Sequence, residues 1–308
     1  MVLDSQCNKV YLSFDISKVA PKTADNLLKV LQKHCVRHSF LKGTKDIWCR
    51  DYMPIQIRPG YIQGYHYDPD YLHQSPEDVE TITDGNAVAR AHGYPCAGMM
   101  QNLRIDGGNI VKAGDYVIMT SKVFEENPGI PTRVVCETIE CSLRARLIVL
   151  PWDTNEPYGH ADGICRYLGD GRILLTNYGQ IDEEMARRFR RILKCYFRSV
   201  KELKYKVKTP CEHNWAYINW LQLDDLLILP KFGVPEDEQA LAQISKLMPD
   251  YAGRTEMVDA TDLVVHGGCL NCCTWTIHEE SAIEKCDADR EMWMERWEEE
   301  DANNDRPD

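Results

Sequence analysis

Apolar runs of strand length alternate along this chain with longer amphipathic segments. Alternating or short continuous apolar runs predict strands, whereas apolar residues three and four apart predict helices. The predicted strands are 8–14, 105–111, 116–119, 147–150, 172–177, 217–223, 226–229 and 263–265. The predicted helices are 22–36, 134–146, 182–197, 235–247 and a segment that opens at Pro76 and ends near Gly93. Pro54 marks a turn or strand start, and the aromatic, polar stretch from Tyr61 begins as a loop.

The order of these elements indicates one α/β domain. Turn residues at 112–115 and 224–225 separate neighbouring strands, so both places predict hairpins. Hairpins argue against a purely parallel, doubly wound sheet. The rhythm of strands, hairpin and helix recurs about every 60 residues, a spacing compatible with structural repeats.

Composition describes an ordinary globular protein. The chain has 308 residues, of which 44% are hydrophobic and 27% charged. No apolar run has membrane-spanning length, and the first residues lack the basic and apolar regions of a signal peptide, so we expect a cytoplasmic protein. Its 13 cysteines are odd in number and scattered, which indicates free thiols in a reducing compartment.

The net charge of −12 is concentrated near the carboxyl end. Residues 279–308 hold 13 acidic and 4 basic residues, a net charge of −9. An acidic chain without a basic stripe does not favour nucleic acid or an anionic membrane as a partner. We expect a single catalytic domain over 1–297, closed by a terminal helix that docks through Trp293 and Trp297, and an acidic tail over 298–308.

The segment 266–275 contains the strongest candidate for a nucleophile. Gly267 and Gly268 follow the predicted strand 263–265 and allow a sharp turn before Cys272. A thiolate is a strong nucleophile at neutral pH, whereas a buried free cysteine is the alternative. Cys273 is expected to be structural, because only one of two adjacent residues on a strand points at a site.

Three more short motifs complete a chemical set with Cys272. They are Trp48-x-x-Asp51, Asp106-Gly-Gly-Asn109 and Gly159-His160-x-Asp162-Gly163. Carboxylates bind a planar guanidinium through paired hydrogen bonds, a thiolate can attack its central carbon, and an imidazole can shuttle the proton. A strand end carrying His160-x-Asp162 would place both side chains on one face.

These four motifs, in this order, resemble the agmatine deiminase and bacterial (Porphyromonas-type) peptidylarginine deiminase family. The resemblance runs from the first helix to Thr274. It implies a five-bladed α/β propeller (pentein) of ββαβ repeats with a central active site. It also implies hydrolysis of a guanidino group to a ureido product and ammonia through a thiouronium on cysteine, with no metal and no other cofactor.

The same resemblance assigns roles position by position. Cys272 matches the nucleophile, His160 the general acid and base, and Asp51 and Asp162 the carboxylates that bind the guanidinium. Asp106 is implied as a third substrate contact. Trp48 and Asn219 are implied on the substrate side of the site.

Departures from the family pattern bear on the substrate. Asn271 stands where agmatine deiminases typically have His before the cysteine, and Trp275 where they have Gln. The sequence leaves agmatine, free arginine and peptide-borne arginine open, although the missing secretion signal disfavours an exported peptidylarginine enzyme. A small guanidino compound is the expected partner, and a homo-oligomer is possible.

Other interpretations stay open at this stage. Cys269-x-x-Cys272 could be a redox pair, and Cys136 with Cys141 could contribute to a zinc site. His266 is expected to pack near the site. The alternative functions are a peptidylarginine deiminase, an amidinotransferase that passes the intermediate to an amine, and a non-catalytic guanidine-binding protein.

Overall fold

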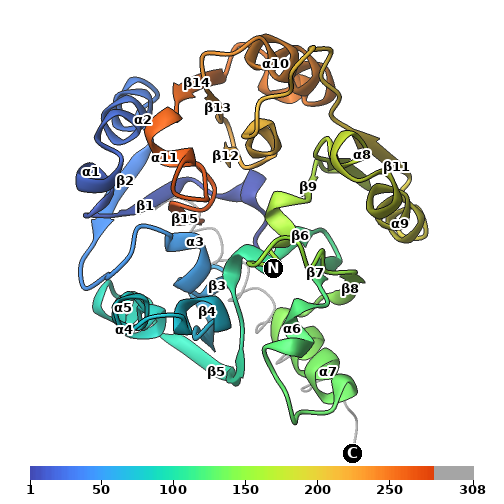
Figure 1. Cartoon of the computed structure of the whole chain (residues 1–308). Coiled ribbons are helices and arrows are strands. Elements are labelled where there is room, and N and C mark those ends of the chain that lie inside the picture. Colours follow the sequence, from blue (N-terminus) through green and yellow to red (C-terminus); the bar gives the residue numbers. More distant parts are fainter. Residues whose placement is uncertain (281–308) are drawn as a thin grey trace, which may run out of the picture.

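Five three-stranded sheets surround a common axis in the computed structural model, which describes residues 1–280 (Figure 1). In every sheet the first strand is antiparallel to the second, and the second is parallel to the third. One or two helices connect the second strand to the third. The expected five-bladed α/β propeller of ββαβ units is therefore confirmed.

The blades follow one another along the chain. Their strands are β1 (Lys9–Ser13), β2 (Arg37–Leu41), β3 (Ile55–Arg58), β4 (Tyr61–His66), β5 (Cys96–Arg104), β6 (Val111–Ala113), β7 (Tyr116–Thr120), β8 (Arg146–Leu150), β9 (Cys165–Tyr167), β10 (Arg172–Leu175), β11 (Ser199–Glu202), β12 (Leu221–Gln222), β13 (Leu227–Lys231), β14 (Thr255–Asp259) and β15 (Thr274–Ile277). The helices are α1 (Ile16–Val19), α2 (Pro21–Lys33), α3 (Cys49–Tyr52), α4 (Pro76–Glu80), α5 (Gly85–Ala91), α6 (Lys122–Glu125), α7 (Thr132–Leu143), α8 (Tyr178–Ile181), α9 (Glu183–Leu193), α10 (Glu236–Leu247) and α11 (Thr261–Val264).

One blade is assembled from both halves of the chain. Strand β15 pairs antiparallel with β1, with Leu12 opposite Thr274 and Lys9 opposite Ile277. Strand β2 then pairs parallel with β1 on its other side. Because this blade joins early and late residues, its pairing closes the ring.

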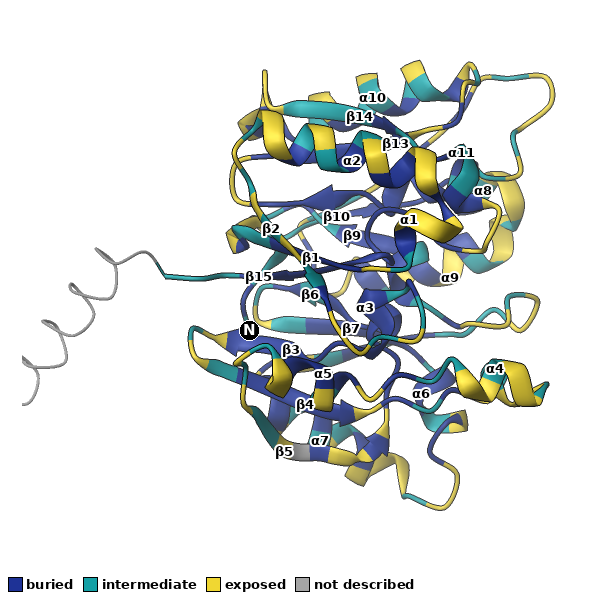
Figure 2. Cartoon of the chain, turned by 90° about the vertical axis from the view of Figure 1, so that its left-hand side faces the viewer, coloured by how far each residue is buried: buried dark blue, intermediate teal, exposed yellow. Residues whose placement is uncertain are grey.

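Helix caps set where the longer helices begin. The Asp182 carboxylate accepts the Met185 N–H at the start of α9, and α10 carries three acidic residues in its first turn. Helix α2 turns Leu27 and Leu31 into the core and its polar side outward. Figure 2 shows the same division, with exposed helix faces around buried strands. The predicted helices 22–36, 134–146, 182–197 and 235–247 are thus confirmed within a few residues.

The predicted strand 263–265 is wrong. These residues form the end of the helical turn α11 and its exit, and Val265 is 64% exposed. The Asp259 carboxylate accepts the Thr261 N–H and starts the turn. Strand β14, the third strand of its blade, ends before these residues.

Smaller differences lie in the second, third and fifth blades. The stretch from Tyr61 forms β4 rather than a loop. The helix expected from Pro76 is two helices, because the Asp84 carboxylate caps a new one by accepting the Ala87 N–H. The strands expected over 105–111 and 217–223 are shorter than expected, because 3-10 turns (Gly107–Asn109 and Asn214–Ile218) precede β6 and β12.

Part of the expected domain organisation lies outside the described residues. This applies to the tail 298–308 and to Trp293 and Trp297. Within residues 1–280, no helix combines the length and the apolar character that crossing a bilayer requires.

The first strands of the blades approach one another around the common axis (Figure 1). A buried charge cluster includes Lys112 on β6 and Arg166 on β9, two of these strands. The Asp4 carboxylate lies 2.6 Å from Lys112 Nζ, 3.1 Å from an Arg166 nitrogen and 4.0 Å from an Arg50 nitrogen. The three cationic side chains are at most 7% exposed. Burial alone would raise the pKa of Asp4, but Lys112 and Arg166 hold it well below its usual range.

We predict that Asp4→Asn lowers the free energy of unfolding by about 3–5 kcal/mol, because it leaves three buried cations without their anion. Asp15→Asn is the matched control, since Asp15 pairs with the exposed Lys18 and should change stability by less than about 1 kcal/mol. Urea denaturation at neutral pH measures both. The contribution of Asp4 to the free energy of unfolding should be complete above about pH 4. It should decrease as the pH falls further, because the pKa of Asp4 in the folded protein is depressed. Equal stability losses in both variants would contradict this account of the axis.

Candidate active site

The four sequence motifs meet at one end of the axis. The Arg50 N–H donates a hydrogen bond to the Cys272 carbonyl at 2.9 Å, which joins α3 to the cysteine turn. A Cβ on Gly268 would lie 2.4 Å from the Trp48 ring, so glycine is needed where the ring crosses this backbone. The second Gly-Gly motif is equally tight, since a Cβ on Gly108 would lie 2.4 Å from His160 Nδ1.

Cys272 lies in a turn that precedes β15, not at the end of a strand. Its side chain is buried, with the residue 6% exposed, and it borders two cavities. The Cys272 N–H donates to Asn219 Oδ1 at 3.2 Å, and Sγ lies 3.7 Å from Asp162 Oδ2. Cys273 points elsewhere and its Sγ contacts the Leu270 carbonyl, in agreement with a structural residue.

Asp162 is held by two amides behind the cysteine. Its Oδ2 accepts hydrogen bonds from Asn271 Nδ2 at 2.7 Å and from Asn219 Nδ2 at 3.2 Å. Asn219 is fully buried and lines neither cavity that Cys272 borders. The structure therefore gives Asn219 a supporting place beneath the cysteine turn, which differs from the substrate-side place expected from the sequence.

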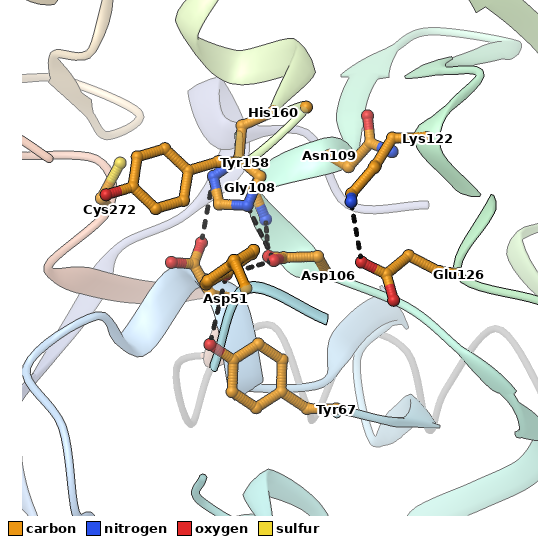
Figure 3. Close-up of polar contacts among 12 residues, drawn as sticks. Asp51, Tyr67, Asp106, Gly108, Asn109, Lys122, Glu126, Tyr158, His160 and Cys272 are labelled. Atoms are coloured by element: carbon orange, nitrogen blue, oxygen red, sulfur yellow. Dashed lines mark hydrogen bonds and ion pairs between the residues drawn. The ribbon is translucent and has the colours of Figure 1, made fainter. Parts of the chain in front are cut away.

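His160 lies between two carboxylates (Figure 3). Its Nε2 is 2.7 Å from Asp106 Oδ2, and its Nδ1 is 3.9 Å from Asp51 Oδ1. A strand end was expected here, but His160 instead precedes a 3-10 turn (Ala161–Gly163) that contains Asp162. The turn directs His160 to Asp106 and Asp162 to Cys272, so the two side chains serve different parts of the site.

Burial and the shared carboxylates shift the proton affinities of these groups. Burial alone would lower the pKa of His160, but Asp106 and Asp51 raise it well above its usual value. Burial, followed by Asp106, raises the pKa of Asp51. Burial, followed by Asp162 and Asp51, also raises the pKa of the Cys272 thiol. The free site therefore favours an imidazolium and a protonated thiol.

One carboxylate oxygen in this cluster has no donor. Asp51 Oδ1 is buried and accepts no hydrogen bond from any residue in 1–280. Ligand atoms of Asp51, Asp106 and His160 lie within 4.8 Å of one another, a grouping that a metal ion can also use. His160 and Asp106 already form a close ion pair in this buried setting, so their ligand atoms are engaged with each other.

Two cavities open from Cys272 and His160. The polar chamber, about 380 Å³, is lined by Asp51, Trp48, Tyr71, His266 and the carboxylates of Asp46 and Asp78. The apolar chamber, about 310 Å³, is lined by Asp162, by Ile164, Tyr178, Ile181 and Trp215, and by the carboxylates of Asp153 and Glu156. Among residues 1–280, neither chamber is lined by a lysine or an arginine.

Several residues at this site were not singled out from the sequence. The Tyr71 hydroxyl donates to Asp106 Oδ2 at 2.6 Å, and Tyr158 borders both chambers. Glu156 accepts the N–H groups of Tyr158 and Gly159 and shapes the loop before His160. Tyr158 directly precedes the Gly-His motif and could have been flagged by that position, whereas Tyr71 carries no local signal.

The alternative zinc site does not assemble in the described part of the chain. Cys136 and Cys141 lie on α7, and neither joins a group of potential metal ligands within residues 1–280. Cys269 and Cys272 are both free thiols.

Comparison with known proteins agrees with this geometry. An agmatine deiminase of Pseudomonas fluorescens (strain Pf-5) is 24% identical over 279 residues, which covers 75% of this chain and 74% of the relative. The solved agmatine deiminase of C. jejuni superimposes with a TM-score of 0.71 at 16% identity, over 90% of this chain and 95% of the other. DDAH from Pseudomonas aeruginosa superimposes with a TM-score of 0.56 at 15% identity, over 88% of this chain and 100% of the other. At these identities the structural likeness establishes the shared fold.

The sequence profile of one family spans almost all of the described chain. The profile covers residues 6–277 and includes all four motifs of the site. The chain belongs to the family of Porphyromonas-type peptidyl-arginine deiminases.

Proposed function

We propose that this protein hydrolyses the guanidino group of a small substrate with an amine tail, such as agmatine, to a ureido product and ammonia. The observation that carries the proposal is the buried Asp51 Oδ1 beside Cys272 and His160, which accepts no hydrogen bond within residues 1–280. A buried carboxylate oxygen without a donor is costly, and a guanidinium supplies both the missing donors and the compensating charge.

The substrate cation would also activate the nucleophile. The carboxylates of Asp162 and Asp51 contribute to the raised pKa of the Cys272 thiol. A guanidinium bound between them offsets their charge and stabilises the thiolate. Substrate binding therefore releases the Cys272 proton to solvent, and this proton accounts for the conversion of the released ammonia to ammonium.

The first half of the reaction forms a covalent intermediate. Cys272 Sγ attacks the central guanidinium carbon, and the His160 imidazolium donates its proton to one unsubstituted nitrogen. The carbon–nitrogen bond breaks and ammonia leaves. The tail and the second unsubstituted nitrogen stay on the carbon, which is now bound to sulfur as a thiouronium.

The second half regenerates the thiol site. His160, now neutral, accepts a proton from water, and the resulting hydroxide attacks the thiouronium carbon. The carbon–sulfur bond breaks, and the hydroxyl proton of the intermediate passes to the departing sulfur. Cys272 therefore leaves as a thiol, and the product keeps the new oxygen as a ureido group. The net reaction consumes one water and releases one ammonium ion.

The lining of the apolar chamber supports an amine tail. Ile164, Ile181 and Trp215 suit a methylene chain, and Asp153 and Glu156 suit a terminal ammonium. The carboxylate of free arginine would lie close to these two acidic side chains. The described residues that line the chamber include no lysine or arginine to pair with it. Like charges brought together in this way disfavour binding.

We predict that Cys272→Ala lowers kcat by about 10⁴-fold or more, because it removes the nucleophile. Cys273→Ala is the matched control and should keep most of the activity, since that thiol lies outside both chambers. Ammonia release, circular dichroism and the mass of acid-quenched protein are measured for each variant. A mass increase on Cys272 of the parent enzyme supports the intermediate. Full turnover by Cys272→Ala would overturn the assignment.

We predict that agmatine exceeds free arginine by at least about tenfold in kcat/KM, with a blocked arginine peptide between them. Asp153→Asn should reduce this ratio, because it removes one acid from the apolar chamber. Asp78→Asn changes the polar chamber and should keep the ratio within about twofold. Side-by-side ammonia assays provide the values.

Three outcomes would redirect the proposal. Preference for the peptide keeps the chemistry and changes the substrate class to peptidylarginine. Product that forms only when an amine acceptor is added supports an amidinotransferase. Binding of guanidines without turnover of any of them supports a non-catalytic binding protein.

A further inference from the structure

Tyr71 lies beside the acid–base pair although it belongs to none of the four motifs. It is part of a 3-10 turn (Asp70–His73) between β4 and α4. Its ring meets the Tyr158 ring edge-on at 5.0 Å and the His160 ring at 6.1 Å. The Tyr71 hydroxyl donates a hydrogen bond to Asp106 Oδ2 at 2.6 Å.

That oxygen is the one closest to His160. Asp106 Oδ2 lies 2.7 Å from His160 Nε2, while Asp106 Oδ1 accepts the Gly108 N–H at 3.2 Å. Tyr71 and His160 therefore share one carboxylate oxygen. A donor on a carboxylate stabilises its charge and weakens its attraction for a second proton donor.

Tyr71 is suited to stay a donor. Burial, followed by Asp106, raises the pKa of Tyr71 well above its usual value, so its hydroxyl keeps its proton at neutral pH. The Tyr67 hydroxyl is 3.5 Å from the Tyr71 hydroxyl and does not reach Asp106. Within the described residues, Tyr71 is the only side chain besides His160 that contacts Asp106 Oδ2 through a hydrogen bond or ion pair.

The turn that carries Tyr71 is anchored to the body of the protein. The Asp70 carboxylate is 2.5 Å from Lys122 Nζ, and the Asp70 N–H donates to both Glu126 oxygens at 3.3 Å. Lys122 is 4% exposed and lies beside Glu126 (Figure 3). A Cβ on Gly159 would lie 2.6 Å from Lys122 Cβ, so the same lysine backs the residue before His160. Lys122 therefore helps to position both Tyr71 and His160, the two side chains that contact Asp106 Oδ2.

We infer that Tyr71 is a positioning residue that acts through Asp106 and sets how firmly His160 holds its proton. This inference rests on the proposed function, in which His160 donates a proton to the leaving nitrogen. Too firm a hold would make the imidazolium a poor acid. The hydroxyl of Tyr71 moderates that hold, and its ring keeps the imidazole facing the polar chamber.

His160 has several ionisable neighbours besides Asp106. The groups that face it from the surrounding elements are Asp51 on α3, Asp162 on the 3-10 turn, Glu156 and Tyr158 on the preceding loop, Tyr71, and Cys272 before β15. Only the Tyr71 contribution can be removed by deleting a single neutral oxygen that bonds Asp106. Tyr71→Phe is therefore the discriminating variant.

The test compares Tyr71→Phe with Tyr67→Phe, which deletes a nearby hydroxyl but no bond to Asp106. In Tyr71→Phe, Asp106 should hold the His160 proton more firmly, so the alkaline limb of the kcat profile should move up by about 0.5 to 1 pH unit. Turnover of agmatine at neutral pH should fall about three- to tenfold with KM within about twofold. Tyr67→Phe should leave both limbs in place.

A second readout does not require turnover. Nitrogen-15 chemical shifts of the His160 ring, followed from pH 5 to 11 in the resting enzyme, should show the same upward shift in Tyr71→Phe alone. Unchanged titration and unchanged limbs would overturn the inference. Lower turnover with unchanged titration would reduce Tyr71 to a structural residue and also overturn it. If the parent enzyme releases no ammonia, the proposed function fails, while the titration still decides whether Tyr71 acts on His160.

Discussion

The constraint on which the site depends is the burial of three acidic side chains, with Asp51 and Asp162 near Cys272 and Asp106 against His160. Like charges in a dry environment repel strongly, so each needs its own compensation. His160 lies against Asp106, and two amides hold Asp162. Asp51 keeps an oxygen that accepts no hydrogen bond within residues 1–280, so its compensation is incomplete. In the proposed reaction, the guanidinium supplies the missing donors and the missing charge.

The cluster on the axis has the opposite charge arrangement. Arg50, Lys112 and Arg166 surround the single carboxylate of Asp4, whereas the site has three carboxylates around a single imidazolium. Asn271 belongs to both regions, because it donates to Asp162 and also lines the small cavity beside Arg166. A neutral amide at this position separates the two charge clusters.

Patterns along the chain predicted those parts of the molecule that local forces determine. The helix around Leu27 and Leu31 follows from its periodicity, and the hairpin of β6 and β7 follows from its turn residues. The run 263–265 failed because apolar content alone cannot distinguish a strand from a buried helical turn.

The site likewise contains residues that the sequence could identify and residues that it could not. Its motif residues could be named because glycines and reactive side chains recur together. Tyr71, far from every motif, could not be found, since its role depends on the turn that brings its hydroxyl to Asp106. Asn219 could be found by resemblance, but its depth below Cys272 is a property of tertiary packing.

The blade formed by β15, β1 and β2 has a consequence for how the protein folds during its synthesis. Cys272 stands two residues before β15, and β15 reaches its place only by pairing with β1. A ribosome makes those two strands at opposite times, with more than 250 residues between their pairing partners. The thiol therefore meets Asp51 and Asp162 only after the ring is complete. Incomplete chains carry the carboxylates without this thiol, so the proposed reaction is withheld from nascent forms and becomes possible only with the last contact of assembly.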